Sequence, residues 1–119
     1  TIKGLEGGID LSINRSATIG QYKNQHGSRT VFHPRDFECS GKDMEWNGID
    51  EWQRFALQAL NGEGPLTKAL TWNAGMYLFY AGLSSNIQDG IDKAKKVIKS
   101  GLALKQLERL INWRQKNYD

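Results

Sequence analysis

The chain has few of the residues that mark several protein classes: of 119 residues, one is cysteine, two are histidine and two are proline. The single Cys39 excludes an internal disulfide framework and favours a reducing compartment, so we expect a cytoplasmic protein. One cysteine and two histidines are too few for a His/Cys zinc site within one chain. The longest apolar stretch, residues 69–83, is too short to span a bilayer, and no signal-peptide pattern opens the sequence. We therefore expect no membrane partner.

The charge of the chain is distributed unevenly. Residues 1–85 carry eight Lys/Arg and nine Asp/Glu, whereas residues 86–119 carry eight Lys/Arg and only four Asp/Glu, so the net charge of +3 divides into −1 and +4. A basic segment can indicate an anionic partner such as nucleic acid. The more ordinary interpretation is the solvated face of terminal helices. The length suits a single unit covering residues 1–119.

The first third of the chain has the β-branched and aromatic residues, bounded by Gly and Asn/Gln clusters, that are typical of strands. We expect three short strands, at residues 2–5, 17–23 and 28–33. Residues 23–27 suit a hairpin loop, because Gly27 tolerates a positive φ. Pro34 ends the last strand, since it donates no backbone hydrogen bond.

Four helices are expected after residue 48, because the apolar period changes to 3.6. Asn47 is the expected N-cap of the first helix, whose apolar stripe includes Trp52, and Asn61-Gly62 ends it. The second, residues 66–81, is apolar almost all round and should be the most buried. Ser85 and Gln88 have capping-box spacing at the start of the third, which Ser100-Gly101 ends. The fourth carries its stripe at Leu104, Leu107, Leu110 and Ile111, with Trp113 near its end.

Strands followed by helices give an α+β order. The same order fits the last portion of a larger α/β sheet, and the two interpretations stay open at this point. We assign Trp52 and Trp72 to the core, because both lie on helices that need core residues. Asn73, in the apolar second helix, suits a buried amide bonded to backbone better than a ligand. Cys39 suits inert packing or a plain surface thiol.

Glycines and carboxylates cluster near the amino end, in the run Gly4-Leu5-Glu6-Gly7-Gly8-Ile9-Asp10. Glycine N–H groups could approach a phosphate there, and Glu6 and Asp10 could hold Mg²⁺ through phosphate-bound waters. A Gly-rich turn with solvated acids explains the same run. Neither G-x-x-x-x-G-K-[ST] nor G-x-G-x-x-G occurs in the sequence. The residues alone therefore do not name a reaction.

Several runs, taken in order, resemble a known family. Residues 61–65 read NGEGP, residues 72–78 read WNAGMYL, and Ala81-Gly82 follow them. This order resembles the "G-x-x-G-P … L-N-A-A … L-Y-x-A-G" run of anthranilate phosphoribosyltransferase. Residues 85–103 are similar to the family's next run, residues 33–37 (HPRDF) to its "P-E-D-F-G", and residues 4–7 (GLEG) to its "G-x-D-G". The resemblance spans essentially the whole chain.

The resemblance implies an enzyme that uses Mg²⁺ and transfers phosphoribosyl from phosphoribosyl pyrophosphate to an aromatic amine, a reaction of tryptophan biosynthesis. It implies that residues 1–119 are the carboxy-terminal portion of a larger α/β domain. The family's helical amino-terminal domain, through which a homodimer would form, and its "G-T-G-G-D" diphosphate loop are absent from this chain. We therefore expect the chain to be inactive alone.

One position departs from the family pattern and points to a divergent branch. The resemblance places the family's adjacent Asp-Glu metal pair at Ile9 and Asp10, so one carboxylate ligand is replaced by an apolar side chain. Glu6 would have to compensate from another position. The alternative function is a non-catalytic homologue that binds nucleic acid through the basic residues Lys93, Lys96, Lys99, Lys105 and Arg109. A third interpretation is that this part of the protein is scaffold only.

Overall fold

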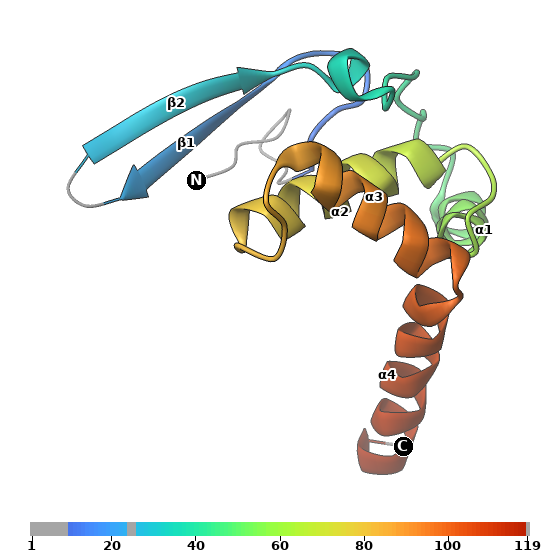
Figure 1. Cartoon of the computed structure of the whole chain (residues 1–119). Helices are drawn as coiled ribbons and strands as arrows, with labels where there is room; N and C mark the ends of the chain where they lie inside the picture. Colours follow the sequence, from blue (N-terminus) through green and yellow to red (C-terminus); the bar gives the residue numbers. More distant parts are fainter. Residues whose placement is uncertain (1–9, 24–25, 119) are drawn as a thin grey trace.

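The computed structural model describes residues 10–23 and 26–118, and the chain in this part is a hairpin followed by helices (Figure 1). The elements are β1 (Ala17–Lys23), β2 (His26–Phe32), a 3-10 helix (Pro34–Phe37), α1 (Ile49–Leu60), α2 (Thr67–Tyr80), α3 (Ile87–Lys99) and α4 (Leu102–Tyr118). This order confirms the predicted α+β arrangement and its four helices. The predicted strand at residues 2–5 lies outside the described residues.

Strands β1 and β2 form an antiparallel pair, in which Ala17 faces Phe32 and Lys23 faces His26. Ala17 and Ile19 are buried while Thr18 between them is exposed, the alternation of a strand with one covered face. The hairpin was predicted, but its second strand begins at residue 26 and not at 28, so the proposed five-residue loop is wrong. Pairing Lys23 with His26 extends the ladder and satisfies backbone groups that a longer loop would leave to solvent.

Helix α2 is the centre of the molecule, as its all-round apolar sequence predicts. Trp72 and Met76 are both 0% exposed and pack with Leu11, Ile19 and Ile91. The Phe37 ring lies 5.6 Å from that of Trp72, between ring centroids. The core therefore joins the hairpin, the segment that precedes it and the pair α2–α3.

Two glycines allow α2 and α3 to approach closely. A Cβ added at Gly75 would lie 2.8 Å from the backbone nitrogen of Ile91, and one added at Gly90 would meet the carbonyl oxygen of Gly75. Contacts this short cannot hold a methyl group without moving a backbone. The two glycines thus set the distance between the two most buried helices.

The caps of two helices differ from the prediction. Gly48, with φ +105°, is the N-cap of α1 in place of Asn47, whose amide Nδ2 donates to Glu51 Oε1 at 2.9 Å. At α3 the N-cap is Asn86, one residue after the predicted Ser85: Asn86 Oδ1 accepts from the Asp89 N–H at 2.9 Å. In both helices the N-cap is the residue that follows the predicted one, because residue types alone do not determine which of two neighbours is the N-cap.

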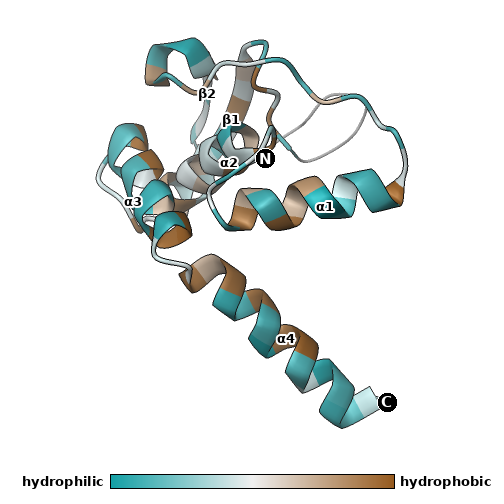
Figure 2. Cartoon of the chain, turned by 90° about the vertical axis from the view of Figure 1, so that its right-hand side faces the viewer, coloured by the Kyte–Doolittle hydropathy of each residue, from teal (hydrophilic) through white to brown (hydrophobic). Residues whose placement is uncertain are grey.

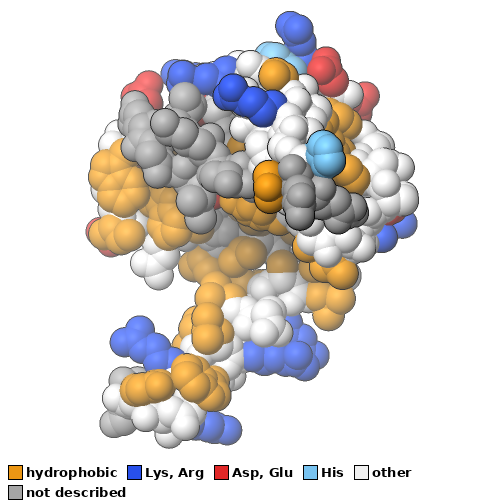
Figure 3. Space-filling view, turned by 90° about the vertical axis from the view of Figure 1, so that its left-hand side faces the viewer, with side chains coloured by type: hydrophobic (Ala, Val, Ile, Leu, Met, Phe, Trp, Pro, Cys, Tyr) orange, Lys and Arg blue, Asp and Glu red, His pale blue; other side chains and the backbone are white. Residues whose placement is uncertain are grey.

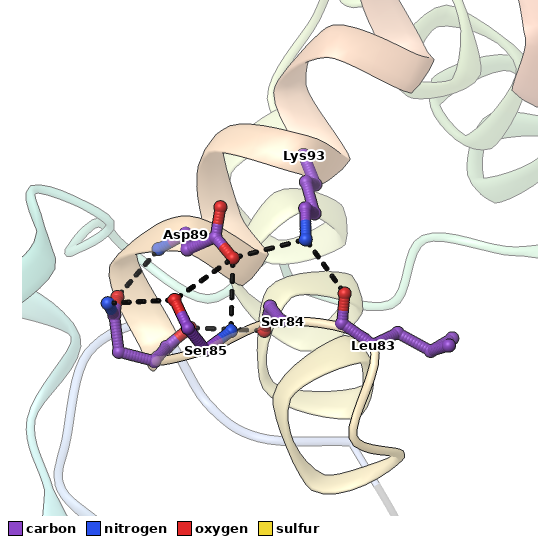
Figure 4. A network of polar contacts seen from close by, with 6 residues as sticks. Leu83, Ser84, Ser85, Asp89 and Lys93 are labelled. Atoms are coloured by element: carbon purple, nitrogen blue, oxygen red, sulfur yellow. Dashed lines mark hydrogen bonds and ion pairs between the residues drawn. The ribbon is translucent and has the colours of Figure 1, made fainter.

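A polar network surrounds the start of α3 (Figure 4). Asp89 Oδ2 accepts from the backbone N–H of Ser85 at 3.0 Å and pairs with Lys93 Nζ at 3.1 Å. Lys93 Nζ also donates to the carbonyl oxygen of Leu83 at 2.8 Å. The hydrogen bond from Ser85, followed by that from Lys93, lowers the pKa of Asp89 below its ordinary value. The carboxylate therefore fastens the turn between α2 and α3.

Helices α1 and α4 bury much less than their patterns predict. On α1 only Ala59 is fully buried, and Trp52, assigned to the core from the sequence, is 45% exposed. Helix α4 extends away from the body and has no fully buried side chain (Figures 1 and 2). The predicted core role of Trp52 is wrong, because its side chain lines an open groove and is not enclosed by other elements on all sides. No helix in the described part of the chain is long and apolar enough to cross a membrane.

Candidate functional site

The segment that follows the Gly-rich run is fastened to α2 by Asn73. Asn73 Oδ1 accepts from the Leu11 N–H at 2.7 Å, and Asn73 Nδ2 donates to the carbonyl oxygens of Leu11 and Ala69, both at 3.0 Å. The amide is partly buried, and these bonds satisfy its oxygen and its nitrogen. The prediction that Asn73 bonds to backbone is confirmed. Its partner Leu11 is 62 residues away, so the contact also holds Asp10 beside α2.

A second polar contact, which the sequence did not indicate, fastens the same segment from the other side. Asp43 accepts from the Ser12 hydroxyl at 2.6 Å and from the Ile13 N–H at 3.1 Å. The Gly41 N–H donates to the carbonyl oxygen of Ile13 at 3.0 Å. The pairing of Asp43 with residues 30 and 31 positions earlier has no local sequence signal. It makes residues 42–46 part of the lining of a cavity.

These contacts frame an open groove of about 810 Å³. It is lined by residues 10–13 and 42–46, by the apolar stripe of α1 and by residues at the start of α2. Most of its lining is apolar, and Trp46 and Trp52 are both exposed at it. Concave apolar sites with a few polar groups are where proteins usually bind ligands or partner segments. The groove is therefore the candidate functional site.

Asp10 lies in this lining and is exposed to solvent. Burial raises the pKa of the Tyr77 hydroxyl, and the negative charge of Asp10 raises it further, so the carboxylate lies near this ring of α2. Arg15 and Lys42 also line the groove, and Lys42 Nζ is 3.5 Å from Glu45 Oε1. The site thus combines carboxylates and cations at the edge of an apolar surface.

The described residues do not by themselves fit a Mg²⁺ site. Among residues 10–23 and 26–118, no three His, Cys, Asp or Glu side chains gather closely enough to hold a metal ion. The Asp43 carboxylate already accepts two hydrogen bonds, and Glu45 pairs with Lys42. Mg²⁺ usually keeps several waters and binds through one or two protein carboxylates, so Asp10 could supply one oxygen ligand but forms no metal cluster with the other described residues. Glu6 and Ile9, the other positions of the predicted site, lie outside the described residues.

The five basic residues predicted to bind nucleic acid differ in their contacts and lie on two different helices. Lys93 is engaged with Asp89 and Leu83. All five are exposed on two successive helices, Lys93, Lys96 and Lys99 on α3 and Lys105 and Arg109 on α4. Figure 3 shows Lys and Arg side chains beside hydrophobic ones along the extended α4. The positive charge of residues 86–119 is thus accessible to solvent, and on α4 apolar side chains lie beside the basic ones.

Cys39 belongs to the core and not to the groove. It is buried, and its N–H donates to the carbonyl oxygen of Pro34 at 2.9 Å. Burial raises the pKa of its thiol, although the positive charge of Lys95 opposes this effect. A buried thiol with a raised pKa is a poor nucleophile. Of the two interpretations of Cys39, packing in the core is confirmed and a surface thiol is wrong.

No protein-family model matches the chain. Individual enzymes do. The chain is 29% identical over 117 residues to the anthranilate phosphoribosyltransferase of Methanobrevibacter smithii, which covers 95% of this chain and 35% of the relative. It is 28% identical over 114 residues to the enzyme of that name from Paracidovorax citrulli, covering 92% of this chain and 33% of the relative. For the enzyme from Burkholderia mallei the identity is 28% over 118 residues, with 96% and 34% covered.

The chain spans about a third of the length of these curated relatives. That share is consistent with the predicted correspondence to a carboxy-terminal portion. The match covers both the groove and the core, since it takes in nearly every residue of the chain. The chain is therefore similar, over almost its whole length, to about one third of anthranilate phosphoribosyltransferase, the family that the order of its motifs predicted.

Proposed function

We propose that the chain is the carboxy-terminal portion of the α/β domain of an anthranilate phosphoribosyltransferase-like protein. That protein would transfer phosphoribosyl from phosphoribosyl pyrophosphate to an aromatic amine in the cytoplasm. The observation that supports this most directly is an identity of 28–29% over at least 92% of the chain to enzymes named for that reaction. A third of such an enzyme would not complete the reaction alone.

Within this proposal, Asp10 has a specific part. It would be the remaining carboxylate of the family's metal and diphosphate site, with Glu6 as the second acid. The support is its position: Asp10 is exposed in the groove, directly before the segment that Asn73 and Asp43 hold in place. Mg²⁺, when bound, would neutralise diphosphate charge. The contribution of this chain is to fix one carboxylate at the groove.

The test is phosphoribosyl transfer to anthranilate by a longer protein that contains this sequence. We expect turnover from that protein, none from residues 1–119 alone, and at least about a tenfold loss with Asp10→Ala, since removing one charged group from a phosphate site costs on the order of 1.4 kcal/mol or more. Asp50→Ala is the matched control, because Asp50 is exposed in the first turn of α1 and is not in the groove lining. Equal activity of both variants would remove Asp10 from the site, and no transfer by the longer protein would reject the function.

A second candidate function follows from the charge of residues 86–119. The net charge of +4 there, with all five predicted basic residues exposed on α3 and α4, favours a non-catalytic homologue that binds nucleic acid. Log Kd should then rise with log salt with a slope of about 0.9 for each phosphate contacted in duplex DNA. Lys105→Gln with Arg109→Gln should reduce that slope, whereas Lys68→Gln, on α2, should not. A flat salt dependence would reject this candidate.

A further inference from the structure

The sequence contains two Asn-Gly pairs, Asn47-Gly48 and Asn61-Gly62, one at each end of α1. Asparagine is among the thermolabile residues. In such a pair the backbone nitrogen of glycine can attack the side-chain amide carbon of asparagine, because glycine has no Cβ that hinders the approach. The two pairs have the same chemistry, so a difference in their reactivity would come from the fold.

The backbone nitrogen of Gly62 is restrained by the fold. Its N–H donates to the carbonyl oxygen of Ala59 at 3.0 Å, and Asn61 is the C-cap of α1. A Cβ added at Gly62 would lie 3.5 Å from Cγ2 of Ile98, so this turn also packs against α3. Attack by the Gly62 nitrogen therefore requires that a backbone hydrogen bond break and that a packed turn move.

The backbone nitrogen of Gly48 lacks these restraints. No described residue accepts a hydrogen bond from the Gly48 N–H, although the Gly48 carbonyl oxygen accepts from the Trp52 N–H at 3.2 Å. Asn47 is exposed and lies in residues 39–48, which form neither helix nor strand and lead into α1 (Figure 1). The Asn47 side chain donates to Glu51 Oε1 in a contact that is also exposed. Both reacting groups of this pair are thus accessible and free to approach each other.

We propose that Asn47 is a site of spontaneous deamidation. The Gly48 nitrogen loses its proton and forms a bond to Cγ of Asn47, and ammonia leaves, so that a five-membered succinimide ring is closed. Water then opens the ring at either of its two carbonyl groups and gives aspartate or isoaspartate at position 47. The reaction needs only water, so it is independent of whether the proposed transferase function holds.

The modification changes the place where the chain enters α1. The new carboxylate replaces an amide that donates to Glu51, and it adds a negative charge close to the acidic first turn, Asp50 and Glu51. Isoaspartate also lengthens the backbone by one methylene directly before the N-cap, Gly48. Trp46 and Trp52, on either side of this point in the sequence, both line the groove. Deamidation therefore alters one edge of the candidate functional site as the protein ages.

The test is incubation of the folded chain in mildly alkaline buffer, followed by peptide mapping with mass spectrometry. Conversion at Asn47 should be on the order of tenfold faster than at Asn61 or more, because attack at Gly62 first costs a backbone hydrogen bond. In the urea-unfolded chain the two asparagines should convert at similar rates, since neither nitrogen is then restrained. Conversion at Asn61 that equals or exceeds that at Asn47 in the folded chain would overturn the proposal, and so would an Asn47 that stays unmodified.

Two variants and one exchange measurement test the site and its effect on α1. Asn47→Gln should stop the reaction at this position, because the longer side chain closes a six-membered ring much more slowly, whereas Asn61→Gln is the matched control and should leave conversion at Asn47 unchanged. The Trp52 N–H, which bonds to Gly48, should exchange about threefold faster or more in the aged, more acidic fraction than in fresh protein. Equal exchange in the two fractions would overturn the effect on α1.

Discussion

The helix pair α2–α3 and the single helix α4 differ in burial far more than in sequence character. Trp72 on α2 is 0% exposed, whereas Trp113 on α4 is 53% exposed. Both α3 and α4 have an apolar stripe, but the stripe of α3 includes Ile91 and Ile98, which are buried, and that of α4 has no fully buried member. An amphipathic pattern therefore predicts that a helix has an apolar face. The pattern does not predict that other residues of the same chain bury this face.

The pair α2–α3 is covered because its backbones can approach each other and because polar contacts fasten the neighbouring segment. Gly75 and Gly90 permit the approach, and Asn73 fastens residue 11 to the same helix. Helix α4 has neither feature in the described part of the chain. Four changes test this difference, taken from the largest expected effect to the smallest.

The largest effect is expected from removing the central aromatic ring. Trp72→Ala should lower the free energy of unfolding by about 3–5 kcal/mol, because it deletes a fully buried side chain and leaves a cavity. Trp113→Ala, the same change on α4, should alter it by less than about 0.5 kcal/mol in dilute, monomeric protein. Urea unfolding followed by circular dichroism measures both. Equal losses in the two variants would show that α4 is as well packed as the core.

The next effect comes from the close approach of α2 and α3. Gly90→Ala should lower the free energy of unfolding by about 1–3 kcal/mol, because the new methyl group meets the carbonyl oxygen of Gly75 and forces the helices apart. In an unconstrained helix the same change would stabilise, since alanine has the higher helix propensity. The sign of the change is thus decisive, and urea unfolding measures it. Lys96→Ala, at an exposed position of α3, is the control and should change little.

A loss no larger than that of Gly90→Ala is expected from removing the Asn73 amide, which holds residue 11 to α2. Asn73→Ala should cost about 1–3 kcal/mol, since it leaves the N–H and carbonyl of Leu11 without their partner. Amide hydrogen exchange should show faster exchange at Leu11 than in the unaltered chain. Asn112→Ala removes an amide from the exposed surface of α4 and should leave both measurements unchanged. Unchanged exchange at Leu11 in Asn73→Ala would contradict the fastening role.

The smallest effect concerns the carboxylate at the start of α3. The pKa of Asp89 is lowered in the folded chain, so its contribution to stability is present above the ordinary aspartate pKa of about 4 and is lost as the pH falls through the lower, folded value. Asp89→Asn should remove that part of the pH dependence. The measurement is the urea midpoint between about pH 6 and pH 2, compared for the two chains. Identical slopes would show that the Ser85 and Lys93 contacts do not stabilise the charged form.

Some features of the site could be predicted because their causes are local. The apolar character of residues 66–81 predicts a central helix, and an amide within it must find backbone partners, as Asn73 does. The partners themselves could not be predicted. Asn73 bonds to residue 11, and Asp43 bonds to Ser12, across 62 and 31 positions of sequence. No periodicity or spacing within a single sequence carries that information.

The sequence by itself determined the order of hairpin and helices, the central place of α2 and the similarity to anthranilate phosphoribosyltransferase. These depend on side-chain period, on Gly and Pro positions and on the order of short motifs, all of which are written along the chain. Only the tertiary structure decided that Trp52, unlike Trp72, borders a groove, and that α4 extends with its apolar face uncovered in the described part of the chain. The physical reason is that burial depends on which other element meets a face, and contacts between residues far apart in sequence decide that.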